Sequence, residues 1–180
     1  MVELPAPAAK LELERLLGAW YVLISNQGFW RARTHPRIEH DRPAPGSRGE
    51  LRSSMRFRQP DLLGRVQRKV IYGGDVIAED GAYVWRGEGL LRVVECRWCV
   101  PLIDPEGRWV VAWFGRTNLG RGGGLGIHTR DPSIPQAMLD EILAQVRAHP
   151  FLAEVVDGQR RCDGLYATVQ DWIPPQPYEL

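Results

Sequence analysis

Apolar and polar residues alternate along most of the chain with a period of two. This is the spacing of a β-strand that buries one face and exposes the other. In the segment 50–59, one face carries Leu51, Ser53, Met55 and Phe57, and the other carries Arg52, Ser54, Arg56 and Arg58. Together with a first strand that starts at Gly18, the pattern predicts strands at about 34–42, 50–59, 65–73, 82–87, 93–103, 108–116 and 124–130.

Short segments rich in glycine, proline and aspartate separate these strands. Such residues favour turns, because they tolerate or fix unusual backbone angles. The predicted turns are 43–46, 60–61, 73–75, 80–81, 104–107 and 120–124. Many short strands with regular turns indicate an all-β barrel or sandwich.

Two segments depart from the period of two. Leucines at 11, 13, 16 and 17 lie just before Gly18, and we expect one or two helical turns there that cap an apolar surface. Ser133 and Gln136 have the spacing of a capping box, and apolar residues then recur at helical spacing until Pro150. We therefore expect one α-helix over 133–149, packed on the barrel, and an extended tail over 150–180.

This order of elements resembles the lipocalin family. Gly18-Ala19-Trp20 matches the Gly-x-Trp signature of that family, and Arg130 ends the last predicted strand, where the family's arginine packs over the tryptophan. The resemblance covers about 11–156 and includes the hairpin at 102–109, although Thr117-Asn118 is only a weak counterpart of the second family motif. It implies a single domain, 1–180, with an eight-stranded up-and-down antiparallel β-barrel (calycin-like) over about 18–130.

The resemblance also separates structural residues from candidate functional ones. Gly18, Trp20 and Arg130 form the structural signature, because an indole can plug one end of a barrel while a guanidinium stacks on it. An eight-stranded barrel has room for one small ligand. By alternation from Trp20 and Arg130, and from the apolar faces of the other strands, we expect the cavity to be lined by Val22, Ile24, Asn26, Met55, Phe57, Tyr72, Tyr83, Trp98, Trp113 and His128.

Some orientations stay open at this stage. On the strand 108–116, either Trp109, Val111 and Trp113 or the alternate residues face the cavity, and the tryptophans either stack on a flat ligand or fill the core. His128 is the titratable residue of most interest. It is a buried histidine bonded to a neighbouring carbonyl, a ligand or substrate contact that would be catalytic in an enzyme, or a haem ligand.

Composition narrows the possible partners. The 23 Lys and Arg residues and 22 Asp and Glu residues leave a net charge of +1, which argues against nucleic acid as the main partner. No apolar run has the length of a membrane span. The histidines and cysteines do not have the spacing of a zinc site, and we expect no metal and no cofactor.

The number of cysteines indicates the cellular compartment in which we expect the protein. Cys96 and Cys99 are expected on opposite faces of one strand, and pairing of either with Cys162 is left open. An odd count of three without a recognisable export signal favours reduced thiols and a cytoplasmic protein.

Two functions remain open, and the lipocalin resemblance implies the first of them. The first is an intracellular protein, monomeric or homodimeric, that holds a small hydrophobic molecule of fatty-acid, isoprenoid or polyketide type. The alternative is an isomerase or cyclase of secondary metabolism that folds a flexible apolar substrate in the same cavity. Confinement and a few polar contacts are enough for such chemistry, so it leaves no sequence motif.

Overall fold

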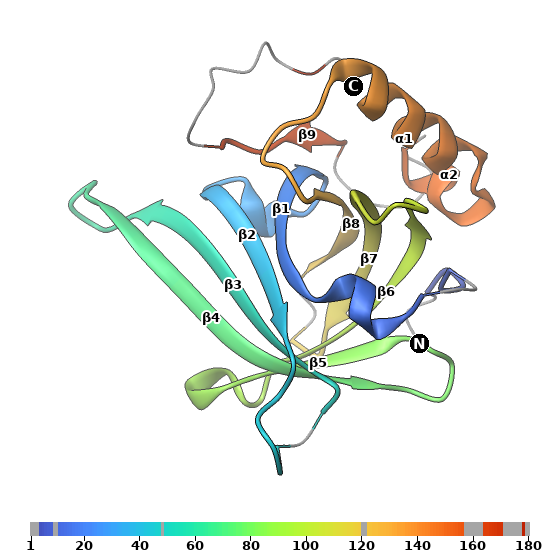
Figure 1. The fold of residues 1–180 in the computed structure, drawn as a ribbon. Helices are drawn as coiled ribbons and strands as arrows, with labels where there is room; N and C mark the ends of the chain where they lie inside the picture. Colours follow the sequence, from blue (N-terminus) through green and yellow to red (C-terminus); the bar gives the residue numbers. More distant parts are fainter. Residues whose placement is uncertain are drawn as a thin grey trace.

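The computed structural model describes residues 4–8, 11–47, 49–119, 122–156, 164–170 and 178. Eight antiparallel strands follow one another around a closed barrel (Figure 1), as the sequence predicts. Each strand pairs with the next along the chain, and β1 pairs with both β2 and β8, which closes the sheet. The strands are β1 (Gly18–Ser25), β2 (Thr34–Asp41), β3 (Leu51–Pro60), β4 (Val66–Ile77), β5 (Tyr83–Gly87), β6 (Glu95–Ile103), β7 (Trp109–Thr117) and β8 (Gly122–Thr129).

Strand β4 is longer than the sequence predicts. The segment 73–75 is not a turn but continues the pairing of β4 with both β3 and β5. Gly73 is needed there because the indole of Trp85 lies on its backbone, where a Cβ would be 2.2 Å from the indole Nε1. The glycine therefore permits a close approach of a side chain, and Asp75 becomes a strand residue.

The segments outside the barrel also differ from the prediction. Helix α1 (Gln136–Ala148) begins at Gln136 without a side-chain cap, and Gln136 bonds to Asp140 at 2.8 Å, so the capping box at Ser133 does not form. Pro150 does not end helical structure but begins a second helix, α2 (Pro150–Val156), since proline is well accommodated in a first turn. The short strand β9 (Tyr166–Ala167) then pairs with β1.

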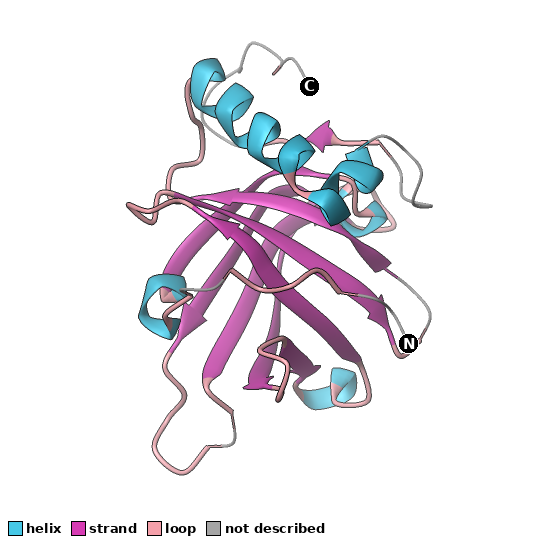
Figure 2. Ribbon diagram, turned by 90° about the vertical axis from the view of Figure 1, so that its right-hand side faces the viewer, coloured by secondary structure: helices cyan, strands magenta, loops and turns pink. Residues whose placement is uncertain are grey.

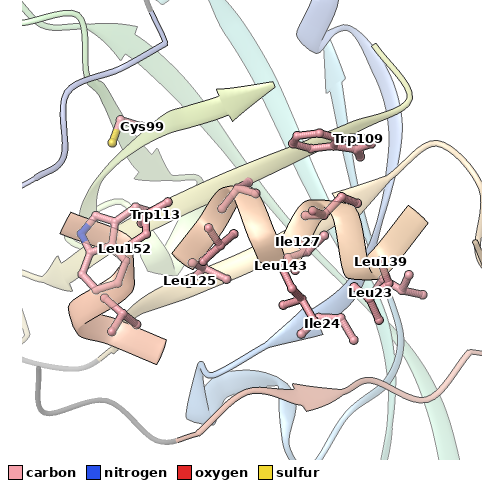
Figure 3. Packing of buried hydrophobic residues seen from close by; sticks show 14 of the residues in the cluster. Leu23, Ile24, Cys99, Trp109, Trp113, Leu125, Ile127, Leu139, Leu143 and Leu152 are labelled. Carbon is pink, nitrogen blue, oxygen red and sulfur yellow. The ribbon is translucent and has the colours of Figure 1, made fainter. Parts of the chain in front are cut away.

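Helices α1 and α2 lie against the outer face of the barrel (Figure 2). Their buried residues pack on the outer faces of β1, β7 and β8 (Figure 3). This contact explains why those strands are apolar on both faces. The outer cluster includes Leu23, Ile24, Trp109, Val111, Trp113, Leu125 and Ile127 from the strands, and Leu139, Ile142, Leu143, Val146, Leu152 and Val155 from the helices.

One end of the barrel is closed by the predicted Trp20–Arg130 pair. The guanidinium carbon of Arg130 lies 3.5 Å from the centre of the Trp20 ring. Arg130 also donates to the carbonyls of Ala19 (3.0 Å) and Arg15 (2.8 Å), and Trp20 Nε1 donates to the carbonyl of Leu16 (2.8 Å). The 3₁₀-helix η1 (Leu13–Leu16) therefore caps this end, as the leucine-rich segment predicts.

Candidate functional site

A cavity of about 760 Å³ occupies the barrel interior. Leu16 and Trp20 line it at the closed end, where β1 begins. At the other end it reaches the 3₁₀-helix η2 (Gly28–Trp30), which follows β1, and Leu91 in the 3₁₀-helix η3 (Gly89–Leu91), which follows β5. Its volume lies within the usual range for small-molecule sites.

Several residues expected to line the cavity are there. Asn26, Met55, Trp98 and His128 line it directly. Three others do not line it but pack behind residues that do: Val22 and Phe57 belong to the buried cluster that contains Trp30 and Ile38, and Tyr83 stacks on Trp98. Contact of these residues with a ligand stays a prediction.

Three expected residues lie elsewhere. A bulge in β1 between Val22 and Ile24 breaks the alternation, so Ile24 points to the outer core under the helices. Trp113 also faces outward and meets Phe151 of α2 edge to face, with ring centres 5.2 Å apart. Tyr72 lies on the outer face of β4, where it is 40% exposed and lies beneath Arg52.

The inner face of β7 is therefore the one that carries Val110, Ala112 and Phe114. Phe114 continues a series of aromatic contacts across the interior. Tyr83 stacks on Trp98 with ring centres 4.5 Å apart, Trp98 faces Phe114 at 5.8 Å, and Phe114 meets His128 at 5.9 Å. The first two pairs lie within 21° of parallel, so these rings stack on one another.

A chain of buried polar residues, absent from the sequence prediction, crosses the inner part of the cavity. Ser53 donates its hydroxyl hydrogen to Asp75, and Trp98 Nε1 donates to the other carboxylate oxygen at 2.7 Å. His40 Nδ1 lies 2.9 Å from Ser53 Oγ. Because Ser53 has only one hydrogen and gives it to the carboxylate, His40 is the donor of this bond while Asp75 is ionised.

Burial shifts the pKa values of Asp75, His40 and His128. Burial raises the pKa of Asp75 to about 6, although its hydrogen bonds from Ser53 and Trp98 act in the opposite direction. It lowers the pKa of His40 to about 4, with a further contribution from the positive charge of Arg130. It lowers the pKa of His128 to about 3, with a smaller contribution from His40. Both imidazoles are therefore neutral at pH 7.

These shifts predict how stability depends on pH. Between about pH 6 and pH 4, His40 and His128 are protonated in the unfolded chain but neutral in the folded protein. The free energy of unfolding therefore decreases as the pH falls. Asp75 opposes this loss, because the folded state takes up its proton first. The net uptake of one proton on unfolding from these three groups corresponds to a loss of about 1.4 kcal/mol per pH unit.

Urea unfolding between about pH 4.5 and pH 7 measures this slope. Asp75→Asn removes the opposing group and is expected to steepen the loss to about two protons, whereas His128→Leu is expected to flatten it. A D75N slope equal to that of the unaltered protein would contradict the assignment.

One ring nitrogen of His128, the buried Nε2, has no hydrogen-bond partner among the described residues. Nε2 lies against Gly126, where a Cβ would be 2.5 Å away.

The cysteines lie on opposite faces of β6, as expected. Cys96 lines the cavity, and Cys99 lies in the outer core with Sγ 3.4 Å from the carbonyl of Pro5. Burial raises the pKa of both thiols to about 12. Cys162 is outside the described residues. Within the described part of the chain, no cluster of three or more His, Cys, Asp or Glu residues is arranged to hold a metal, and no helix is long and apolar enough to cross a membrane.

Comparison with known proteins identifies the fold. No protein-family profile matches the sequence, and no well-characterised protein matches it significantly by sequence. Insecticyanin from the tobacco hornworm Manduca sexta matches with a TM-score of 0.61 and 12% identity, over 97% of this chain and 87% of that one. Lobster apocrustacyanin A1 matches with a TM-score of 0.57 and 12% identity, over 95% and 91% of the two chains. Apocrustacyanin C2 matches with a TM-score of 0.58 and 11% identity, over 94% and 91%. These proteins are lipocalins, and the chain described here has the lipocalin fold.

Proposed function

We propose that this protein binds a small hydrophobic molecule within the barrel, inside the cell. The observation that carries the proposal is the cavity of about 760 Å³, closed at the Trp20 end and lined by aromatic side chains. Such a cavity is large enough to bury most of a small ligand. Cys96 and Cys99, which are free thiols on opposite faces of one strand, support action in a reducing compartment.

Binding of N-phenyl-1-naphthylamine tests this proposal, because this neutral probe fluoresces when it enters an apolar site. We expect a saturable signal with about one probe per chain. Native mass spectrometry of the protein after mild purification is expected to show an added mass that organic extraction removes. Absence of both a saturable signal and any added mass would count against the proposal.

A second candidate, an isomerase or cyclase, is favoured by one observation. The His40–Ser53–Asp75 chain places a carboxyl group with a raised pKa and a neutral imidazole beside an apolar cavity. A carboxyl group whose pKa is raised toward neutrality is suited to moving protons. Incubation of the protein with the extracted ligand separates the two functions: conversion that is lost in His40→Gln, with binding retained, indicates an enzyme, and unchanged ligand indicates a binding protein.

A further inference from the structure

We propose that the open end of the barrel docks on the surface of an anionic lipid bilayer, so that the mouth of the cavity faces the membrane. This proposal goes beyond the binding of a ligand and does not depend on it. It is carried by two features of this end of the molecule: exposed apolar side chains on three separate loops, and unpaired basic side chains beside them.

The exposed apolar side chains gather at one end of the barrel. The open end is the one where β1, β3, β5 and β7 finish, opposite Trp20. The six most exposed large apolar residues of the described chain all lie there, and each is at least 61% exposed. They are Leu62, Leu63, Val66, Leu90, Val93 and Leu119. By contrast, the loops at the closed end, 42–50, 78–82 and 104–108, contain no large apolar residue. Such a concentration on one face marks an interaction surface.

The hairpin that joins β3 to β4 projects well beyond the barrel (Figure 1). Phe57 is the last buried residue of β3, and residues 61–70 are all exposed. Three more residues of β3 follow Phe57 before the turn, so the tip lies about 10 Å beyond the buried part of the strand. The turn itself is fixed, because Asp61 Oδ1 accepts from the backbone N–H groups of Leu63 and Arg65, each at 2.9 Å. It therefore holds the two leucine side chains of the tip in solvent.

A second group of apolar residues lies at the opening of the cavity. Leu91 in η3 and Leu119 after β7 are exposed and also line the cavity. Leu90 and Val93 flank Leu91 in the chain and are more exposed still. A protein partner needs a closely packed, complementary contact of roughly 800 Å² on each side, which separate loop tips do not offer. A bilayer interface adapts to such tips and accepts apolar side chains to a depth of about 5–10 Å.

Basic side chains lie beside the apolar ones. Arg65, Arg68 and Lys69 are exposed on the hairpin, and Arg92 is exposed at the end of η3. None of these four makes a salt bridge within the described part of the chain. Arg68 also lies directly opposite Arg58, and like charges opposite one another in a sheet are unfavourable. An anionic surface would offset this repulsion.

The acidic side chains at this end already have partners. Glu88 lies 3.6 Å from Arg52, and Glu95 lies 2.7 Å from Arg86. The carboxylate of Asp61 accepts the hydrogen bonds of the hairpin turn. The unpaired charge at the open end is therefore positive. Anionic lipids of the cytoplasmic leaflet attract basic segments, and apolar side chains among basic ones are typical of proteins that lie on such a surface.

Sedimentation of the full chain with lipid vesicles tests the proposal. Two compositions are compared, phosphatidylcholine alone and phosphatidylcholine with about 30% phosphatidylserine. We expect the anionic vesicles to be bound at least about tenfold more tightly than the neutral ones, since each basic residue near the surface contributes about fivefold. A rise in salt from about 0.1 M to about 0.5 M is expected to remove most of this difference.

Leu62→Ser combined with Leu63→Ser removes the apolar tip. Because both side chains are exposed, we expect the variant to stay folded and to bind the anionic vesicles at least about tenfold more weakly. Val76→Ser combined with Ile77→Ser is the matched control, because this adjacent pair is also exposed but lies at the closed end of β4. We expect it to bind within about twofold of the unaltered chain.

Arg65→Gln combined with Arg68→Gln tests the charge. We expect it to weaken binding to the anionic vesicles about tenfold or more and to leave binding to the neutral ones unchanged. Arg42→Gln combined with Arg147→Gln is its control, because it removes the same net charge from exposed positions away from the open end. We expect this control to lower the affinity by less than about threefold.

Each other outcome overturns the proposal. Equal binding to the two kinds of vesicle does so, as does a loss in V76S/I77S as large as in L62S/L63S. Absence of vesicle binding also does so. If the chain then sediments without lipid as a dimer that L62S/L63S abolishes, the apolar loops form a contact between two copies instead. A failure to bind N-phenyl-1-naphthylamine counts against the proposed function alone, because the vesicle measurement needs no ligand in the cavity.

Discussion

Replacement of Trp20 by alanine is expected to lower the free energy of unfolding by about 3–5 kcal/mol, as for other large-to-small changes at buried aromatic residues. Trp20 is 1% exposed and packs with Leu16 and Val110 at the closed end. The change removes this packing, exposes the surface under Arg130, and leaves the carbonyl of Leu16 without its indole donor. A loss of this size is a large fraction of the stability of a typical domain.

Urea unfolding at about pH 7 measures this loss, and two further variants separate its causes. Trp20→Phe keeps a ring but removes the hydrogen bond to Leu16, so we expect it to cost about 1–3 kcal/mol. Trp85→Phe removes an indole N–H that has no partner among the described residues, and we expect a smaller cost. If W20F and W85F were equally stable, the bond from Trp20 to Leu16 would not contribute as described.

This closed end is the part of the molecule that the sequence predicts best. Trp20 of the Gly-x-Trp signature and Arg130 lie 110 residues apart in the chain, and their contact is what the lipocalin resemblance implies. The faces of β3 also follow from alternation alone, because Leu51 and Phe57 are buried while Arg52 and Arg56 are exposed. The first success depends on the family resemblance, and the second depends on the alternation of side chains along a strand.

The inner faces of other strands do not follow from alternation. A period of two shows which residues share a face, but not which face is inside. Both faces of β7 are apolar. Val110 and Ala112 border the cavity, and Trp109 and Trp113 pack in the outer core beneath α1 and α2. On β1 a single bulge moves Ile24 to the outer face, and the sequence contains no pattern that predicts this bulge.

The hydrogen-bonded residues His40, Ser53 and Asp75 were not predicted from the sequence, for a different reason. Asp75 follows two glycines, and that sequence is typical of a turn. In the structure Gly73 instead accommodates Trp85, and Asp75 is fully buried on β4. His40 and Ser53 meet it from β2 and β3, so the cluster depends on strand register that the sequence does not reveal. The alternation of Ser53 with Met55 and Phe57 is the only signal that places one of these groups on an inner face.

Replacement of Ala112 by phenylalanine is expected to weaken binding of N-phenyl-1-naphthylamine at least about tenfold. Ala112 lies on the inner face of β7 between Val110 and Phe114, and its side chain borders the cavity. A phenyl group there occupies space that a ligand would otherwise fill. Because the ring enters a cavity rather than a packed core, we expect the free energy of unfolding to change by less than about 1 kcal/mol.

Val76→Phe is the matched control, since it adds a ring of the same kind to the exposed outer face of β4. It is expected to leave the probe affinity within about twofold, because surface substitutions away from structural features usually have small effects. Fluorescence titration of the two variants and the unaltered protein makes the comparison, with urea unfolding as a check that each is folded. A folded A112F variant that binds the probe as well as V76F does would show that the probe binds outside the barrel, and the proposed function would lose its site.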